Sequence, residues 1–556
     1  MSGKAHLLTV ALEDYYHVSP LNRIIEPAKW SRFERRLEIG TERTLALLDE
    51  FKIRATFFVL GWVADTAPEL VCKVASRGHE IASRGYYHRG IWQMTPGEFR
   101  EDLVRAQEAL ERASGQKVLG YRVARRWFNH DDLWALEELA RAGYVYDSSI
   151  KPILRAYARE PWRRFAHQHR TASGMIWEFP LSSAEFLGLK IPIAGGNYFR
   201  QLPQPLMRRA VARWDRTYHA PFVMYFHTWE LDPDQPRIQA VPFHQQVRQY
   251  RNLGKMEGIL REYLSRYRFE SIAQRLGIEA RMPSLELAVA STPAARPVRV
   301  FTPAGLEGPT RSGVAPAQVS VVIPCFNEEA ALPYLSNTLE QVAEKLSDRY
   351  QLSLIFVNDG STDSTAAVLD RVFGNRPNCT VIHQPANQGV SAAILTGIRR
   401  ADTEVVCSID CDCTYDPHEL GAMIPLLTAG VDLVTASPYH SGGGVRNVPA
   451  WRLSLSKSAS AFYRLVLHQK LSTYTSCFRV YRRSAILALP LREPGFLGIT
   501  EMLGRLDLRG GRILEFPTVL EVRVLGRSKM KVVRTILGHL GLLGSLLAQR
   551  VLGHQR

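Results

Sequence analysis

Acidic and amide side chains gather where three apolar runs end in the second half of the chain. The runs VSVVIPCF, LSLIFVND and EVVCSIDCD each have the continuous apolar character of a buried strand. The residues of interest at these ends are Pro324, Asn327, Glu328, Asn358, Asp359, Asp410 and Asp412. Two aspartates two positions apart on an extended strand end point the same way. Asp410 and Asp412 can therefore face one Mg²⁺ or Mn²⁺ ion, and such an ion neutralises a nucleotide diphosphate.

The combination of these strand ends, rather than any one of them, points to a nucleotide site. A lone D-x-D is more often a solvated loop, and a lone NDGSTD is more often a turn. Ligands of an open parallel sheet bind at the carboxyl ends of its strands, which is where these residues fall. An acid such as Asp359 can accept hydrogen bonds from the base or the ribose of a bound nucleotide.

Length and charge describe a large protein with an anionic partner. A chain of 556 residues exceeds one ordinary hydrophobic core, so we expect two large domains. The net charge of +16 is typical of proteins that bind nucleotide phosphates, an anionic membrane surface or nucleic acid. Nucleic acid is the least favoured, because the sequence has no zinc-ligand spacing, helix-turn-helix pattern or RNA-recognition signature.

Cysteine usage and hydropathy indicate the compartment. The seven cysteines do not form a disulfide framework, and reduced thiols are typical of the cytoplasm. The N-terminus lacks the pattern of a signal peptide, and no run reaches the roughly 18 apolar residues of a spanning helix. We therefore expect a cytoplasmic protein, held peripherally on the inner face of the cytoplasmic membrane if it contacts lipid.

A linker divides the chain. Residues 282–318 are rich in Pro, Ala, Gly, Ser and Thr, a composition that buries little surface. They separate a domain at 1–281 from a domain at 319–534, and residues 535–556 are expected to form an amphipathic C-terminal helix. Apolar runs alternate with helical patterns in both domains, which predicts the α/β class with mostly parallel sheets.

The second domain closely resembles the family-2 glycosyltransferases over about residues 318–534, because its strand-end motifs occur in that family's order. The resemblance implies a GT-A fold, a doubly wound and mostly parallel sheet, with a nucleotide-sugar donor and Mg²⁺ or Mn²⁺. Asn358 stands where many members have aspartate, and Asp359 follows it. By the resemblance, Asp410 and Asp412 hold the metal and the earlier strand ends bind the donor.

Two later segments, TYTSCFRVYRR and EVRVLGRSKMK, look like motifs of the dolichol- and polyprenyl-phosphate sugar synthases in that family. A lipid phosphate is already anionic, so it can attack the sugar without a strong base and needs mainly cations to position it. Arg479, Arg523 and Lys529 are the candidates, although they could be surface charges. A growing polysaccharide as acceptor would instead require a carboxylate base, for which Glu501 is the candidate.

The sequence of the C-terminal tail suggests two alternatives, binding to a membrane surface or packing against the rest of its domain. Basic residues from Arg523 to Arg534 precede a helical pattern with apolar residues at Ile536, Leu540 and Leu543. A basic cluster that leads into an amphipathic helix is typical of adsorption to anionic lipid. Packing of the helix against the rest of its domain is the alternative, and His539 argues against a spanning helix.

The first domain resembles the metal-dependent polysaccharide deacetylases of carbohydrate esterase family 4 over roughly residues 5–280. The matching stretches include VALEDYYHV, GHEIASRGYYHR, GYRVAR and YFHTWELDPDQPRI. The resemblance implies a distorted (β/α) barrel and a divalent metal such as Zn²⁺. It places Glu13, Asp14 and His88 at the base and ligand positions, Arg122 in the matching stretch GYRVAR, and His227 as the late general acid.

Three positions depart from the pattern of that family. Ala11 replaces the first acid, Arg84 replaces the first histidine, and Ala124 replaces the proline after Arg122. Glu13 can still serve as the base, so Ala11 alone does not show whether the domain retains deacetylase activity. Arg84 offers no lone pair to a metal, and its guanidinium would pair with the neighbouring carboxylates in place of the cation. We therefore expect an impaired deacetylase and doubt a zinc ion in this domain.

The sequence thus predicts a glycosyltransferase that moves a sugar from a nucleotide sugar to polyprenyl phosphate or to a growing polysaccharide, fused to a degenerate deacetylase domain. Two alternatives remain open at this point. One is a bifunctional enzyme whose barrel still removes acetyl groups, with a metal held by Asp14, His88 and water. The other is a non-catalytic scaffold that binds glycans or lipids through both domains.

Overall fold

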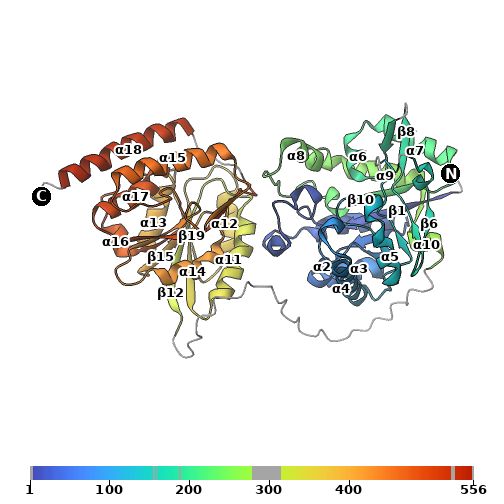
Figure 1. The fold of residues 1–556 in the computed structure, drawn as a ribbon, viewed down its shortest axis with the longest axis horizontal. Coiled ribbons are helices and arrows are strands. Elements are labelled where there is room, and N and C mark those ends of the chain that lie inside the picture. Colours follow the sequence, from blue (N-terminus) through green and yellow to red (C-terminus); the bar gives the residue numbers. More distant parts are fainter. Residues whose placement is uncertain are drawn as a thin grey trace. The chain divides into compact units, whose positions relative to one another are not determined.

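The computed structural model describes residues 4–153, 157, 159–186, 189–278, 315–526 and 532–553. They form two compact units, one built mainly from residues 4–278 and the other mainly from residues 315–553. Figure 1 shows both as α/β folds, each with strands in its interior and helices around them. The expected fold class is therefore confirmed, and each unit is described separately below.

The first unit is built on a sheet of nine strands in the order β10-β1-β2-β3-β4-β5-β7-β6, with β11 also paired to β1. All of these pairs are parallel except β6 with β7. The strands are β1 (Ala5–Leu12), β2 (Thr56–Val59), β3 (Glu80–Ser83), β4 (Gly120–Tyr121), β5 (Tyr146–Asp147), β6 (His167–Thr171), β7 (Gly174–Glu178), β10 (Val223–His227) and β11 (Arg268–Glu270).

Helices and a hairpin complete this unit. The helices are α1 (Leu37–Glu50), α2 (Gly61–Thr66), α3 (Pro68–Ser76), α4 (Pro96–Ser114), α5 (Trp134–Arg141), α6 (Gly196–Gln201), α7 (Gln204–Thr217), α8 (Phe243–Tyr250), α9 (Met256–Arg266) and α10 (Ile272–Leu276). The hairpin pairs β8 (Ser183–Phe186) with β9 (Leu189–Pro192). Helix α4 begins with a capping box, in which the Thr95 hydroxyl accepts the N–H of Glu98.

The sheet curls so that the segment after β7, at Ser182, contacts the end strand β10. The Ser182 carbonyl accepts the N–H of Ile193, and its hydroxyl accepts the N–H of Val223 on β10 at 2.8 Å. One buried cluster accordingly contains side chains from strands across the whole sheet: Leu7, Phe58, Ala82, Tyr146 and Val223. A single interior shared by distant strands is the mark of closure. The unit is the distorted (β/α) barrel that the sequence predicts.

The second unit is built on a seven-stranded sheet in the order β14-β13-β12-β15-β18-β16-β19, in which only β18 runs antiparallel to its neighbours. The strands are β12 (Ala317–Cys325), β13 (Tyr350–Asn358), β14 (Cys379–His383), β15 (Val405–Ser408), β16 (Leu433–Ser437), β18 (Arg479–Arg482) and β19 (Ile513–Pro517). A two-stranded sheet pairs β17 (Gly444–Arg446) with β20 (Val519–Glu521).

Helices cover both faces of this sheet (Figure 1). They are α11 (Leu332–Leu346), α12 (Thr365–Phe373), α13 (Val390–Arg400), α14 (Leu420–Met423), α15 (Ala450–Val466), α16 (Arg483–Leu487), α17 (Phe496–Leu508) and α18 (Val532–Gly553). Alternate residues of β12 enter opposite cores, because side chains of a strand alternate between its faces. Ile323 packs in the core that contains Leu335 of α11, and Val322 packs in the core that contains Ile394 of α13.

The strand order reverses at β12, which positions the site. From β12 the chain adds β13 and then β14 on one side, and it returns to place β15 on the other side. The connections that leave the carboxyl ends of β12 and β15 therefore diverge to opposite sides of the sheet. A crevice opens at such a switch point, and ligands of doubly wound sheets bind there.

In the turn after β13, Gly360 packs closely against the backbone at Ala386. A substitution at this glycine therefore tests how much the close packing contributes to stability. Gly360 has a φ of +64°, and a Cβ there would lie 2.4 Å from the carbonyl carbon of Ala386. We expect Gly360→Ala to destabilise the unit by about 1–3 kcal/mol more than Gly430→Ala does, because overpacking adds to the backbone strain. Gly430 is a matched control, since its φ is +79° but nothing lies within 4 Å. Calorimetric unfolding midpoints measure the difference, and equal shifts would contradict the close approach.

Candidate functional site

An arginine joins the acids at the ends of β12 and β15. Arg523, which follows β20, donates from Nε to Asp412 Oδ2 at 2.5 Å and from Nη1 to Glu328 Oε1 at 2.9 Å. Burial lowers the pKa of Arg523, but attraction to Asp412 and Glu328 outweighs burial and raises it above its ordinary value. The structure thus brings together Glu328, Asp410, Asp412 and Arg523, four of the residues singled out in the sequence.

The negative charge of Asp410 is disfavoured by its surroundings. Desolvation raises its pKa above the ordinary value, and the negative charge of Asp412 raises it further. The Cys477 thiol and Arg523 act in the opposite direction. A carboxyl that resists ionisation beside a second carboxylate is a place where a cation would be stabilised.

A divalent ion fits this site only if a bound nucleotide diphosphate provides some of the oxygen ligands. Among the described residues, no group of three or more His, Cys, Asp or Glu side chains could hold a metal ion by itself. Mg²⁺ is commonly bound through one or two carboxylates together with substrate phosphates and water. Asp410 and Asp412 fit that arrangement, with a diphosphate as the source of the remaining oxygens.

The residues expected to bind the donor shape the neighbouring loops. Asp359 accepts the N–H groups of Gln388 and Gly389, at 2.7 and 2.8 Å, one at each carboxylate oxygen. Asn327 accepts the N–H of Thr362 at 2.7 Å, so it fixes the turn after β13.

Asn358 is buried, and both the oxygen and the nitrogen of its side-chain amide have polar partners. It accepts the N–H of Ser361 at 3.1 Å, and its Nδ2 lies 3.0 Å from Nδ1 of His383 on β14. Pro324 lies within β12, opposite Val357. These contacts hold the loops around the crevice, and the contact of each residue with a donor stays a prediction.

Two expected catalytic residues have structural positions instead. Arg479 on β18 is fully buried and donates to the carbonyls of Ile499 and Tyr474 at 2.7 and 3.0 Å. The Glu501 carboxylate accepts the N–H groups of Arg492 and Glu493 and pairs with Arg505 at 2.7 Å.

Neither Arg479 nor Glu501 is among the residues that line the cavity at the strand ends. The geometry therefore does not support Arg479 as a phosphate-binding cation or Glu501 as a base. Both positions follow from burial, since an interior ionic group needs internal partners. Lys529 lies outside the described residues.

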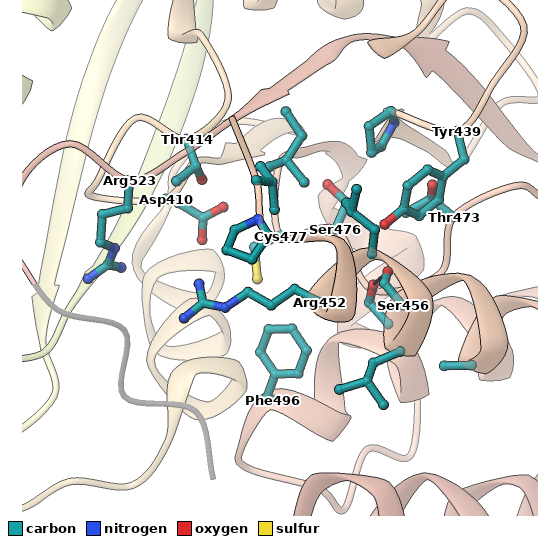
Figure 2. A pocket seen from close by; sticks show the side chains of 18 of the residues that line it. Asp410, Thr414, Tyr439, Arg452, Ser456, Thr473, Ser476, Cys477, Phe496 and Arg523 are labelled. Carbon is teal, nitrogen blue, oxygen red and sulfur yellow. Dashed lines mark hydrogen bonds between the residues drawn. The ribbon is translucent and has the colours of Figure 1, made fainter. Parts of the chain in front are cut away.

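A cavity of about 800 Å³ extends from Asp410, Asp412 and Arg523 to the helices α15, α17 and α18. Its polar end is at the strand ends, and its far walls are largely apolar, formed by side chains that include Leu453, Phe462, Phe496, Leu540 and Leu543. Figure 2 shows Arg452 reaching from α15 toward Asp410, with Cys477 and Phe496 on either side.

Arg452 was not identified from the sequence. It lies in the segment PAWRLSLSKSASAFYR, which matches none of the motifs used above. A signal was present, because a helix places Arg452, Ser456 and Ala459 on one face, and all three line the cavity.

Helices α15 and α18 lie side by side in this unit (Figure 1). The Tyr463 hydroxyl lies 2.9 Å from Nδ1 of His539, and Arg550 donates to the Val466 carbonyl at 2.6 Å. Leu542 and Leu546 of α18 are buried in the same core as α17. Packing of the C-terminal helix within its unit, one of the two expectations, is thus observed.

The same two helices also expose large apolar side chains. Leu465 is 74% exposed and Leu537 is 65% exposed. Other apolar side chains among the described residues of these helices are also more than a third exposed: Trp451, Phe462, Ile536, Leu540, Leu547 and Val551. An apolar surface of this kind marks an interaction site. Across the described part of the chain, no helix has both the length and the hydropathy to span a bilayer.

The barrel has its own group of ionisable residues around Glu13. Arg84 Nε is in direct contact with Glu13 Oε1, as expected from the chemistry of an arginine at this position. His88 Nε2 lies 3.6 Å from Oε1, and His227 Nε2 lies 3.7 Å from Oε2. Burial lowers the pKa of His88 well below its ordinary value, and the charge of Arg84 adds to the effect, so the neutral imidazole is favoured.

Asp14 and Arg122, which the resemblance placed in this group, have other contacts. The Asp14 carboxylate accepts the N–H groups of Tyr15, Arg36 and Leu37, so it caps the start of α1. Burial raises the pKa of Asp14 to about 7.

Arg122 is fully buried in the barrel, where its guanidinium donates to Thr9 Oγ1 and Ser148 Oγ at 2.9 and 2.8 Å. Neither Asp14 nor Arg122 lines the cavity above Glu13. The geometry thus does not support Asp14 as a metal ligand or Arg122 as part of the site.

These residues do not fit a resident zinc ion. A catalytic zinc needs about three protein ligands, but among the described residues no group of three His, Cys, Asp or Glu side chains, Glu13, His88 and His227 included, could hold a metal ion. Ala11 offers no ligand, Arg84 pairs with Glu13, and the Asp14 carboxylate accepts backbone N–H groups. The guanidinium of Arg84 already neutralises Glu13. Ala124 occupies the third altered position, and its carbonyl accepts a hydrogen bond from Arg84 Nη2 at 3.2 Å.

Three family models match the chain. "Glycosyl transferase family 2" matches residues 320–489, "Polysaccharide deacetylase" matches residues 31–146, and "Domain of unknown function (DUF3473)" matches residues 148–277. By structure, a protein of Mycobacterium smegmatis assigned as a polysaccharide deacetylase is 21% identical with a TM-score of 0.34, over 50% of this chain and 93% of that one. Glucosyl-3-phosphoglycerate synthase of Mycobacterium tuberculosis is 22% identical with a TM-score of 0.32, over 41% and 80%.

Curated relatives match the second unit. A polyprenol monophosphomannose synthase of Mycolicibacterium smegmatis is 31% identical over 217 residues, 38% of this chain and 80% of the relative. An undecaprenyl-phosphate mannosyltransferase of Micrococcus luteus is 28% identical over 38% of this chain and 87% of the relative. The chain spans 59% of a dolichol-phosphate mannosyltransferase of Pyrococcus furiosus, at 27% identity. The chain therefore belongs to glycosyltransferase family 2, and residues 31–146 in its first half match the polysaccharide deacetylase model.

Proposed function

We propose that the second unit transfers a hexose from a nucleotide sugar to polyprenyl phosphate on the cytoplasmic face of the membrane. The observation that carries the proposal is the cavity, because it joins the acids at the strand ends to an apolar channel along α15 and α18. An acceptor with an anionic head and a hydrocarbon chain matches both ends of such a cavity. The relatives named for polyprenol, undecaprenyl-phosphate and dolichol-phosphate substrates support the same acceptor class.

The donor is assigned to the strand ends. Asp410 and Asp412 would hold Mg²⁺ or Mn²⁺, which when bound neutralises the diphosphate and favours its departure. Arg523 holds Asp412 and Glu328 in place, so the chain keeps the acidic group ordered before the donor arrives. The loop fixed by Asp359 and Asn327 borders the crevice where the nucleoside would lie.

The acceptor phosphate is assigned to the region of Arg452. An oxygen of the phosphate attacks the anomeric carbon, a new carbon–oxygen bond forms, the bond from that carbon to the diphosphate breaks, and the nucleoside diphosphate leaves. No proton has to be removed from the acceptor, so no general base is needed. The structural role of Glu501 agrees with this assignment and argues against a polysaccharide hydroxyl as acceptor. Arg452 supplies charge and orientation for the phosphate.

We further propose that α15 and α18 rest on the lipid surface. Their exposed apolar side chains would enter the outer part of the bilayer, and the chain's net charge of +16 would favour anionic lipid. Phe462 and Leu540, which line the cavity and are more than half exposed, would then face the acceptor in the membrane.

Asp410→Asn and Asp412→Asn should each lower sugar transfer to polyprenyl phosphate by about 100-fold or more, because charge stabilisation at the leaving group is lost. EDTA should abolish transfer by the unaltered protein, and Mg²⁺ or Mn²⁺ should restore it. Transfer of radiolabelled sugar into a lipid extract measures the effect. Asp402→Asn is the matched control, since the Asp402 side chain is 91% exposed. Full activity in either variant would contradict the assignment of that aspartate.

Arg452→Met should lower kcat/KM for polyprenyl phosphate by about 10- to 100-fold, as loss of one charged hydrogen bond predicts. The KM for the nucleotide sugar should change much less. Arg464→Met is the control, because Arg464 is an exposed arginine of the same helix. Equal effects of the two substitutions would count against Arg452 as the phosphate ligand.

Leu537→Ser combined with Leu547→Ser should weaken sedimentation of the protein with phosphatidylglycerol vesicles by about 10-fold or more, because two leucines lose their transfer to the bilayer. These side chains are 65% and 48% exposed and do not line the cavity. Val104→Ser combined with Met175→Ser, at 46% and 51% exposure in the barrel, is the control. Unchanged sedimentation of the α18 variant would exclude this helix as the docking surface.

A further inference from the structure

A second cavity, of about 130 Å³, lies in the barrel above Glu13. Its walls include three aromatic side chains, Trp127, Tyr225 and Trp229, and the amides of Asn197 and Gln245. Flat apolar walls with a few polar groups are typical of sites for small polar ligands. The glycosyltransferase chemistry proposed for the second unit makes no use of this cavity.

Two buried acids that line the cavity are each paired with an arginine. Arg84 pairs with Glu13, and Arg200 pairs with Glu230 at 2.9 Å. Burial raises the pKa of Glu230, but attraction to Arg200 and hydrogen bonds from His227 outweigh it, and the pKa is lowered to about 2. Both acids are therefore neutralised by fixed arginines, and two further arginines, Arg126 and Arg248, also line the cavity, so its walls favour a ligand that offers oxygen acceptors over a cation.

Two buried donors in the cavity wall lack acceptors. Trp229 Nε1 and Arg84 Nη1 have no hydrogen-bond partner within the described ranges, although the residues are only 8% and 5% exposed. A buried N–H without an acceptor costs free energy, so such donors indicate where a ligand supplies an oxygen. Asn197 Oδ1, an acceptor in the same wall, is also without a partner among the described residues.

We infer that the barrel is a metal-independent receptor for sugars that carry an acetamido group, which it binds without cleaving. The neutral carbonyl of the acetamido group accepts from Trp229 and Arg84, its N–H suits Asn197 Oδ1, and the aromatic walls cover the sugar ring. Arg84 replaces the cation by charge, but it cannot supply an activated water as a metal does. The misfit of a zinc ion is thus the observation that separates binding from hydrolysis.

The first test uses the full chain and N,N′-diacetylchitobiose as probe. We expect calorimetric titration to give saturable binding that is unchanged by EDTA, with no acetate released and no stoichiometric zinc in elemental analysis. Cellobiose and the glucosamine disaccharide, which lack the acetamido group, should bind at least 10-fold more weakly. Loss of binding in EDTA, release of acetate, absence of binding, or equal binding of all three sugars would each overturn the inference.

The second test removes one donor and keeps the aromatic ring. Trp229→Phe should weaken binding of N,N′-diacetylchitobiose by about 3- to 10-fold, the effect of one hydrogen bond. Trp162→Phe is the control, because Trp162 is 49% exposed and does not line the cavity. Circular dichroism establishes that both variants fold, and unchanged affinity in folded Trp229→Phe would overturn the role of Trp229. Sugar transfer is assayed in parallel, so failure here is distinguishable from failure of the proposed transferase.

Discussion

Negative charge concentrated at one edge of a sheet has to be offset by positive charge, and the second unit is arranged around that requirement. The strands β12 and β15 are neighbours, so the acids that follow them converge whether or not a ligand is present. Arg523 offsets Glu328 and Asp412 from a segment more than a hundred residues later in the chain. Burial raises the pKa of Asp410, even though the charge of Arg523 acts in the opposite direction. The unit is therefore ordered yet still favours a cation.

The barrel meets the same electrostatic requirement in another way. Glu13 is also a buried acid at the end of a central strand, but Arg84 neutralises it permanently from the end of β3. A metal ion can be exchanged and can activate water, whereas a guanidinium can do neither. One substitution thus changes what the pocket can do while it leaves the barrel and its cavity in place. In the second unit, the buried carboxyl of Asp410 would be stabilised by a bound cation. In the barrel, the guanidinium of Arg84 already provides the positive charge beside Glu13.

Much of this organisation could be predicted from the sequence, because it depends on local periodicity. Continuous apolar runs give buried strands, and the polar residues at their ends must lie at one edge of a parallel sheet, as Asp410 and Glu328 do. Arg479 could not be placed in this way, since β18 is buried on both faces and the sequence does not say which partners its side chains meet. Arg452 lies on a helix between motifs, and only the tertiary fold brings it to the strand ends. The same holds for Asp14, whose carboxylate was free to face the pocket or the start of α1.

The position of the large cavity between α15 and α18 has a consequence for the path of the lipid. Each methylene exposed to water costs about 0.8 kcal/mol, so complete extraction of a polyprenyl chain would be prohibitive. On the proposed function, the phosphate would enter past the exposed lining residues Phe462 and Leu540 and reach the strand ends while most of the polyprenyl chain stays in the bilayer. The product would leave by the same route, by lateral diffusion in the plane of the membrane. Turnover would then depend on the fluidity of the surrounding lipid as well as on chemistry at the sheet edge.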